Sequence, residues 1–160
     1  MKIIFLDIDG VLNSDNWYYS EQKKHIAYPE DQFDPKLIEL FNKVLTETTD
    51  KIVLTSTWRL RHDVEFMQSL FDKVGIQGQI IDFTPDLKKG NDYVVRGNEI
   101  LKWCMINQDI INCRPMDYTD FVIIDDNSDM LLWQSKYFFQ TDRLCGLTPT
   151  IVKNIIRQFK

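Results

Sequence analysis

The sequence predicts an α/β fold with three layers, in which helices cover both faces of a central, mainly parallel β-sheet. Short continuous apolar runs recur along the chain, and such runs are typical of strands that are buried on both faces. Segments with apolar residues at helical spacing separate these runs, and this alternation favours a parallel sheet. The chain has 160 residues, of which 44% are hydrophobic, so residues 1–160 are expected to form a single domain with a substantial core.

The first expected strand comprises residues 3–6 ("IIFL"). Residues 13–34 follow; they are polar and rich in aromatic side chains without a clear period, which indicates a long loop or a small lid inserted into the domain. A helix is expected to begin at Asp34 and Pro35, because a capping side chain stands directly before a proline at the first helical position.

The rest of the chain continues the alternation. Strands are expected at residues 52–54, 80–83, 121–124 and 136–139, and helices at about residues 63–73, from Arg96 onward, and from Thr148 and Pro149 onward. Residues 84–95, which contain the basic pair Lys88 and Lys89, are expected to form a loop because a proline and a glycine interrupt them.

Polar side chains follow the three clearest strands. These are Asp7 and Asp9 after the first strand, Thr55, Ser56 and Thr57 after the second, and Asp125 and Asp126 after the third. In a parallel sheet, the carboxyl ends of the strands meet at one edge, where ligands bind. Four carboxylates at one edge repel each other, and a divalent cation is the simplest remedy. Oxygen ligands alone favour Mg²⁺, and Gly10 allows a sharp turn beside the site.

The order of these motifs resembles that of the haloacid dehalogenase (HAD) superfamily. "DIDGVLN" resembles its first motif, "IVLTSTWR" its second, Arg96 at a helix start its third, and "VIIDDNSDM" its fourth. The resemblance covers nearly the whole chain, and it implies a Rossmann-like fold with only a small cap insert. The segments "TSTWR", "RGNEILKW", "IIDDNSDM" and "QTDRLCGLT" are also similar to the small phosphatase domains of RNA-repair proteins and polynucleotide kinase-phosphatases.

The resemblance implies a phosphatase that acts through an aspartyl-phosphate. Asp7 would be the nucleophile. Asp9 would protonate the leaving oxygen and then activate water. Ser56 would bind a phosphoryl oxygen, and Arg96 would neutralise the charge that develops on the phosphoryl group.

The resemblance also implies a Mg²⁺ site. Its ligands would be the Asp7 carboxylate, the backbone carbonyl of Asp9 and a carboxylate of the fourth motif. Asp125 is preferred for that last position because Asp129 follows it at the four-residue offset seen in many relatives, and Asp126 is the alternative.

Several assignments stay open at this point. Thr55 or Thr57 can take the place of Ser56, because a shift of one residue at a strand end is easily misjudged. Lys102 is the alternative to Arg96, with Lys88 and Lys89 as further candidates. The candidate substrate-binding residues are Thr55, Thr57, Arg59 and Lys102.

Other functions fit some of these residues. A receiver-like domain that accepts a phosphoryl group in signalling also uses an acidic pair, a phosphorylated aspartate, a Ser or Thr and a basic residue. In that fold, however, the acidic pair follows the first strand and the phosphorylated aspartate follows a middle strand, and here that order is reversed. An inactive scaffold is the second rival, although all four motifs keep reactive residue types. A mononucleotide or small-metabolite phosphatase is the alternative with the same chemistry.

Charge, insert length and cysteine content indicate which substrates and which cellular compartment fit this sequence. A net charge of −5 argues against broad binding to duplex nucleic acid. The short insert at 13–34 favours an open site, which suits a nucleic-acid terminal phosphate on a single-stranded end, most of all a 3′-phosphate. Three cysteines without metal-type spacing (Cys104, Cys113 and Cys145) and the absence of a signal peptide predict reduced thiols and a cytoplasmic protein without a membrane span. Oligomeric state stays open, as does whether the chain works alone or beside a separate kinase or ligase.

Overall fold

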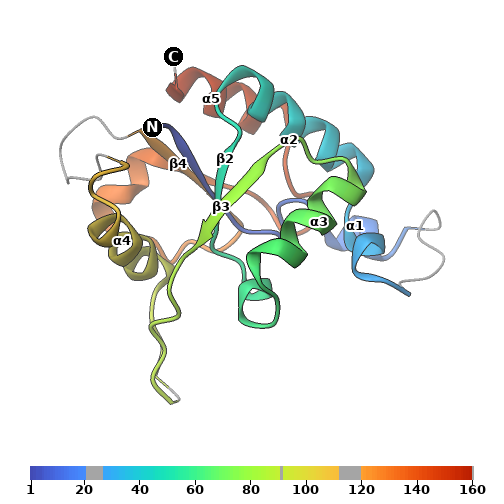
Figure 1. Cartoon of the computed structure of the whole chain (residues 1–160). Helices are drawn as coiled ribbons and strands as arrows, with labels where there is room; N and C mark the ends of the chain where they lie inside the picture. The colour runs from blue at the N-terminus through green and yellow to red at the C-terminus, as the bar shows by residue number, and fades with distance from the viewer. Residues whose placement is uncertain (21–26, 91, 112–119, 160) are drawn as a thin grey trace.

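The computed structural model describes residues 1–20, 27–90, 92–111 and 120–159. Five strands form one sheet in the order β3-β2-β1-β4-β5, and every neighbouring pair is parallel. The strands are β1 (Ile3–Leu6), β2 (Lys51–Leu54), β3 (Gln79–Phe83), β4 (Phe121–Asp125) and β5 (Phe138–Gln140). Figure 1 shows this sheet between two groups of helices, which confirms the predicted three-layer α/β architecture.

The helices divide between the two faces of the sheet. Helices α2 (Pro35–Glu47), α3 (Val64–Val74) and α5 (Pro149–Phe159) pack on one face, where they share an apolar core with alternate residues of the strands, such as Ile4 and Leu6. Helix α4 (Arg96–Ile106) and the 3-10 helix η3 (Leu132–Tyr137) cover the other face around Phe5. Because β1 lies in the middle of the sheet, its side chains enter both cores and all four of its residues are buried.

Local signals explain where the helices begin and end. The Asp34 carboxylate accepts a hydrogen bond from the backbone N–H of Lys36 and caps α2, and Pro35 occupies the first turn. The Asp63 carboxylate accepts from the N–H of Phe66 in the same way at the start of α3, and Gly75 ends that helix in the left-handed conformation. The predicted start of α2 is therefore confirmed, and the helix predicted at about residues 63–73 is confirmed to within one residue at each end.

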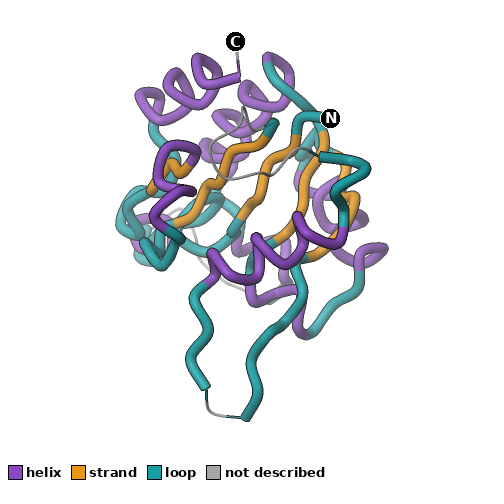
Figure 2. Tube along the Cα trace, turned by 90° about the vertical axis from the view of Figure 1, so that its left-hand side faces the viewer, coloured by secondary structure: helices purple, strands orange, loops and turns teal. Residues whose placement is uncertain are grey.

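Two predicted elements differ in detail. The last strand is Phe138–Gln140 rather than 136–139, because η3 takes up the chain as far as Tyr137. The 13–34 insert contains helix α1 (Asp15–Tyr18) and the 3-10 helix η1 (Pro29–Gln32), with 21–26 outside the described residues. Figure 2 shows that the described parts of the 84–95 segment, residues 84–90 and 92–95, extend away from the body of the molecule as loop.

One prediction about the cysteines is wrong. Cys104 is disulfide-bonded, whereas the sequence predicted three reduced thiols; Cys145 is a free, exposed thiol, and Cys113 lies outside the described residues. Cysteine number and spacing do not reveal which thiols a fold brings together, so the prediction of a cytoplasmic protein loses this support. None of the helices that the structure describes is long and apolar enough to cross a membrane.

Candidate active site

The functional candidates gather where the sheet reverses its strand order. Strand β1 pairs with β2 on one side and with β4 on the other. In open α/β sheets, ligands bind beyond the carboxyl ends of the strands at such a switch point. Asp7 follows β1 directly, and Asp125 is the last residue of β4. The Asp7 N–H donates to the Ile124 carbonyl at 3.0 Å, so the two carboxylates leave the sheet side by side.

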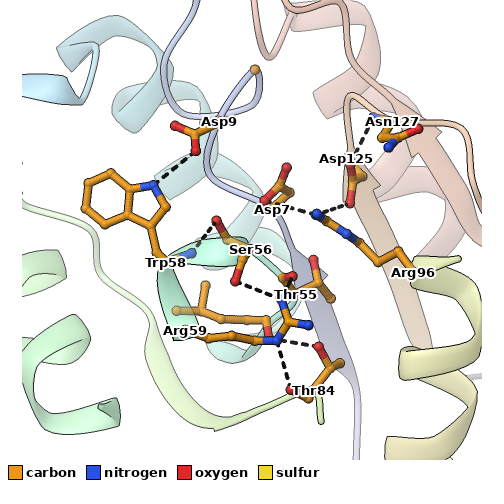
Figure 3. Close-up of polar contacts among 12 residues, drawn as sticks. Asp7, Asp9, Thr55, Ser56, Trp58, Arg59, Thr84, Arg96, Asp125 and Asn127 are labelled. Carbon is orange, nitrogen blue, oxygen red and sulfur yellow. Dashed lines mark hydrogen bonds and ion pairs between the residues drawn. The ribbon is translucent and has the colours of Figure 1, made fainter. Parts of the chain in front are cut away.

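Arg96 joins these two carboxylates. Its Nη1 lies 3.0 Å from Oδ1 of Asp7 and 2.8 Å from Oδ2 of Asp125, as Figure 3 shows. Arg96 is the first residue of α4, and its backbone N–H donates to Oδ2 of Asp129 at 3.0 Å. Asp129 thus fixes the helix start from which the guanidinium reaches the site.

Burial governs the charges of this cluster. It raises the pKa of the Asp7 carboxyl, while Arg96 and a hydrogen bond from the Ser56 hydroxyl oppose that rise. Burial also raises the pKa of Asp125, and the neighbouring Asp7 raises it further, to about 8. Burial alone would lower the pKa of Arg96, but the attraction of both carboxylates raises it overall, so the guanidinium stays charged.

Three carboxylates lie close enough together to hold a metal ion. Asp7, Asp125 and Asp126 each offer an oxygen, and these oxygens lie within 4.8 Å of one another. An all-oxygen set fits a hard cation such as Mg²⁺. Gly10 makes room for the Asp126 carboxylate, since a Cβ at this position would lie 2.4 Å from Oδ2 of Asp126, and its φ of 75° also favours glycine.

The Asp9 carboxylate lies outside this cluster and is held by two donors. The indole Nε1 of Trp58 donates to Oδ2 at 3.1 Å, and Nδ2 of Asn13 donates to Oδ1 at 2.8 Å. Figure 3 shows Asp9 turned from Asp7 toward Trp58. The two carboxylates of "DIDG" therefore occupy different environments, although only one residue separates them.

The second motif places its three hydroxyls differently. Ser56 is fully buried, hydrogen-bonds to Asp7, and caps the 3-10 helix η2 (Thr57–Leu60) by accepting from the Trp58 N–H. Thr55 is also fully buried, and its Oγ1 has no hydrogen-bond partner among the described residues. Thr57 is exposed at the mouth of the site.

The comparison with known families agrees with this geometry. Residues 3–152 match the family described as the HAD domain in Swiss Army Knife RNA repair proteins. The chain belongs to this family of HAD domains. No curated protein and no solved structure matches it significantly. The resemblance inferred from the motifs is therefore confirmed, and every residue of the site lies inside the matched range.

In this HAD domain, Arg59 is buried rather than presented to solvent. Its Nη2 lies 2.6 Å from Oε2 of Glu99, and both side chains are only 5% exposed. Its remaining N–H groups donate to the carbonyls of Thr55, Ser56 and Thr84. Arg59 thus ties the ends of β2 and β3 to α4, and its placement suits a positioning role better than the substrate contact that the sequence predicted.

None of the ion pairs among the described residues joins the other basic candidates of the HAD domain to Asp7 or Asp125. Lys102 is exposed on α4, and Lys88 and Lys89 are exposed in the 84–95 loop. The ion pairs with Asp7 and Asp125 come from Arg96.

Sequence reasoning missed several supporting residues. Asn13 is one, and its position three residues after Gly10 was the available signal, because its Oδ1 accepts the Gly10 N–H at 2.9 Å. Glu99 is another; it is an acidic residue on a helix, and nothing in its spacing indicates a buried partner. The tail segment "QTDRLCGLT" supports the Gly10 turn, since Oγ1 of Thr141 donates to the Gly10 carbonyl at 2.7 Å.

Proposed function

We propose that this HAD domain is a Mg²⁺-dependent phosphatase that removes terminal phosphates from single-stranded nucleic acid through an aspartyl-phosphate, with the 3′-phosphate favoured. The observation that carries the proposal is the position of the Asp7 carboxylate. It lies at the carboxyl edge of the sheet and contacts both the Ser56 hydroxyl and the Arg96 guanidinium. A second carboxylate, that of Asp9, follows two residues later and is held by the Trp58 indole.

The first half-reaction forms a bond between an Asp7 oxygen and phosphorus. The bond from phosphorus to the nucleoside oxygen breaks, and Asp9 gives its proton to that oxygen. In the second half-reaction Asp9 takes a proton from water, and the resulting hydroxide attacks phosphorus. Inorganic phosphate leaves, and Asp7 returns as a free carboxylate.

Ser56 and Arg96 position the phosphoryl group. The Ser56 hydroxyl donates to one oxygen, and Arg96 places positive charge where negative charge develops. Asp7, Asp125 and Asp126 would hold Mg²⁺, which supplies additional charge neutralisation when bound. The buried Thr55 hydroxyl, which has no hydrogen-bond partner among the described residues, is a further donor that a bound phosphoryl group would satisfy.

The family supports the substrate class, because its members are domains of RNA-repair proteins. Because the 13–34 insert is short, we expect it to leave the site open, which suits a chain end better than an enclosed metabolite. A kinase or a ligase would then act on the same ends as a partner enzyme, and a cytoplasmic location remains a prediction. The receiver-like alternative gives Asp9 no purpose, and the inactive scaffold leaves the complete set of reactive residues unexplained.

A substrate panel tests the proposal. We expect turnover in millimolar Mg²⁺ with kcat/KM ordered as 3′-phosphorylated oligonucleotide, then the matching mononucleotide, then sugar phosphates. A 5′-phosphorylated oligonucleotide tests the preferred end. Asp7→Asn is the control variant, because an amide cannot form the acyl-phosphate, and it is expected to lose activity by far more than about tenfold. If kcat/KM is higher for the mononucleotide than for the oligonucleotide, the proposal is wrong and the protein is a nucleotidase instead.

A further inference from the structure

We propose that the hollow between η1 and η2 is the subsite for the leaving group, and that it binds the terminal nucleoside of a nucleic-acid end while Arg61 pairs with the adjoining phosphodiester. The inference rests on the proposed function and extends it to the substrate beyond the reacting phosphate. The hollow has a volume of about 320 Å³, and its lining includes Asp9, Gln32, Thr57, Trp58, Arg61 and His62.

The position of Asp9 decides which hollow receives the leaving group. A residue that protonates the leaving oxygen must reach it, so the leaving group has to lie against the Asp9 carboxylate. Asp9 lines this hollow, and the hydrogen bond from Trp58 keeps its Oδ2 at the hollow's wall.

A second hollow on the other side of η2 fits a nucleotide less well. Its volume is about 90 Å³, far below the several hundred Å³ of typical small-ligand sites, whereas the first hollow reaches the lower end of that range. Three carboxylates also line it, those of Asp86, Glu99 and Asp129. Three cationic side chains, those of Arg59, Lys88 and Arg96, line it too, so its charges are balanced and do not decide the question. Its small volume is what makes it the poorer fit for a nucleoside.

The walls of the first hollow match a nucleoside. The indole of Trp58 and the imidazole of His62 lie 6.1 Å apart between ring centres, and His62 stacks at 4.2 Å on Phe66, which supports it from behind. Aromatic faces of this kind bind bases by stacking without sequence preference. On the opposite wall, Oε1 of Gln32 accepts the Tyr18 hydroxyl at 3.0 Å, which orients its amide.

Arg61 supplies the charge for the next phosphate. Its backbone N–H donates to the Trp58 carbonyl at 3.1 Å, which anchors it at the end of η2 while its side chain is exposed. Within the described part of the chain, none of the ion pairs involves Arg61. Arg59, two residues earlier, is instead paired with Glu99. Arg61 is therefore the guanidinium of η2 that is available to a ligand.

The test compares two substrates on three variants in Mg²⁺. The substrates are a 3′-phosphorylated trinucleotide and p-nitrophenyl phosphate, which carries no phosphodiester. For Arg61→Ala we expect KM for the trinucleotide to rise about tenfold with kcat nearly unchanged, and kcat/KM for the aryl phosphate to stay within about twofold. A plot of log kcat/KM for the trinucleotide against log salt concentration should also have a shallower slope, by about one, because one phosphate contact is lost. Arg61→Lys should restore part of the loss, and Arg157→Ala, which removes the same charge from α5, should change neither substrate.

The outcomes separate this inference from the proposed function. If wild type and Arg61→Ala turn over the trinucleotide equally, or if Arg61→Ala loses both substrates equally, the subsite is wrong while phosphatase activity on nucleic-acid ends stands. If wild type hydrolyses the aryl phosphate but not the trinucleotide, the nucleic-acid substrate fails and the subsite with it. If wild type hydrolyses neither, the phosphatase itself is refuted.

Discussion

At the scale of single residues, the structure separates two carboxylates that the sequence presents as a pair. Asp7 is buried beside Ser56 and Arg96, where an oxygen is suited to attack phosphorus. Asp9 is partly exposed and accepts hydrogen bonds from Trp58 and Asn13. Environment assigns different roles to such carboxylates in many enzymes, and the proposed function gives Asp7 the role of nucleophile and Asp9 that of the acid–base group.

Trp58→Phe tests whether the indole positions Asp9. The phenyl ring keeps the packing against Phe33, whose ring centre lies 5.8 Å from that of Trp58, but it lacks the N–H that Asp9 accepts. Because a hydrogen bond to a charged group contributes about 1.5–3 kcal/mol, we expect kcat to fall about tenfold with KM changed less than about twofold. Steady-state kinetics on the oligonucleotide substrate measures both.

Trp103→Phe is the matched control for this prediction. It also removes an indole N–H from a carboxylate, Oδ2 of Asp82 at 2.6 Å, but on the far face of the sheet from Asp9. It should lower stability and leave kcat unchanged. Equal kcat in wild type and Trp58→Phe would show that Asn13 alone positions Asp9.

At the scale of elements, the buried ion pair of Arg59 and Glu99 holds the site together. Arg59 binds carbonyls at the ends of β2 and β3, and Oε1 of Glu99 accepts the Leu87 N–H at 3.2 Å. Glu99 lies one helical turn after Arg96 on α4. The pair therefore connects the strand end that carries Ser56 with the helix that carries Arg96.

Glu99→Gln is expected to destabilise the protein by about 3 kcal/mol, because it leaves the buried guanidinium without its counter-charge. Urea denaturation measures this change, and kcat/KM should fall with it as Ser56 and Arg96 lose their alignment. Glu30→Gln is the control, since Glu30 forms its ion pair with Lys73 at the exposed surface. It should leave the denaturation midpoint unchanged. If the two substitutions change the free energy of unfolding equally, burial does not make the Arg59–Glu99 ion pair more important for stability than an exposed one.

The sequence predicted these elements better than it predicted their contacts. Continuous apolar runs, such as "IIFL" for β1, predicted β1 and β4 correctly because a central parallel strand has no polar face. Capping residues such as Asp34 marked where helices begin. The displaced β5 has only three residues, of which two are partly buried and one is exposed, so its apolar signal is weak. The positions of Arg59 and Glu99 depend on packing between elements 40 residues apart, which no local spacing encodes.

At the scale of the whole molecule, the fold concentrates negative charge on one edge of an already acidic protein. The net charge is −5, and three carboxylates of the site lie within one metal-sized cluster. Arg96 compensates part of this charge through its two ion pairs. The remaining repulsion and the burial of Asp7 and Asp125 make the metal-free protein sensitive to pH.

The direction of this sensitivity follows from the raised pKa values. Asp125 titrates near 3.8 when unfolded, and burial raises its pKa to about 8 in the folded protein, with Asp7 shifted in the same direction. The folded state therefore binds more protons across this range, and its stability falls as pH rises from about 4 to about 8. Mg²⁺ bound to the ionised cluster opposes that loss, because a ligand of the folded state alone raises stability.

We expect Tm in chelator to fall between pH 5 and pH 8, and the gain in Tm from millimolar Mg²⁺ to be larger at pH 8 than at pH 6. Asp126→Asn should reduce that gain, since it removes one ligand, and scanning calorimetry of both proteins measures it. A gain that is independent of pH, or one that survives intact in Asp126→Asn, would mean that this cluster is not where Mg²⁺ binds.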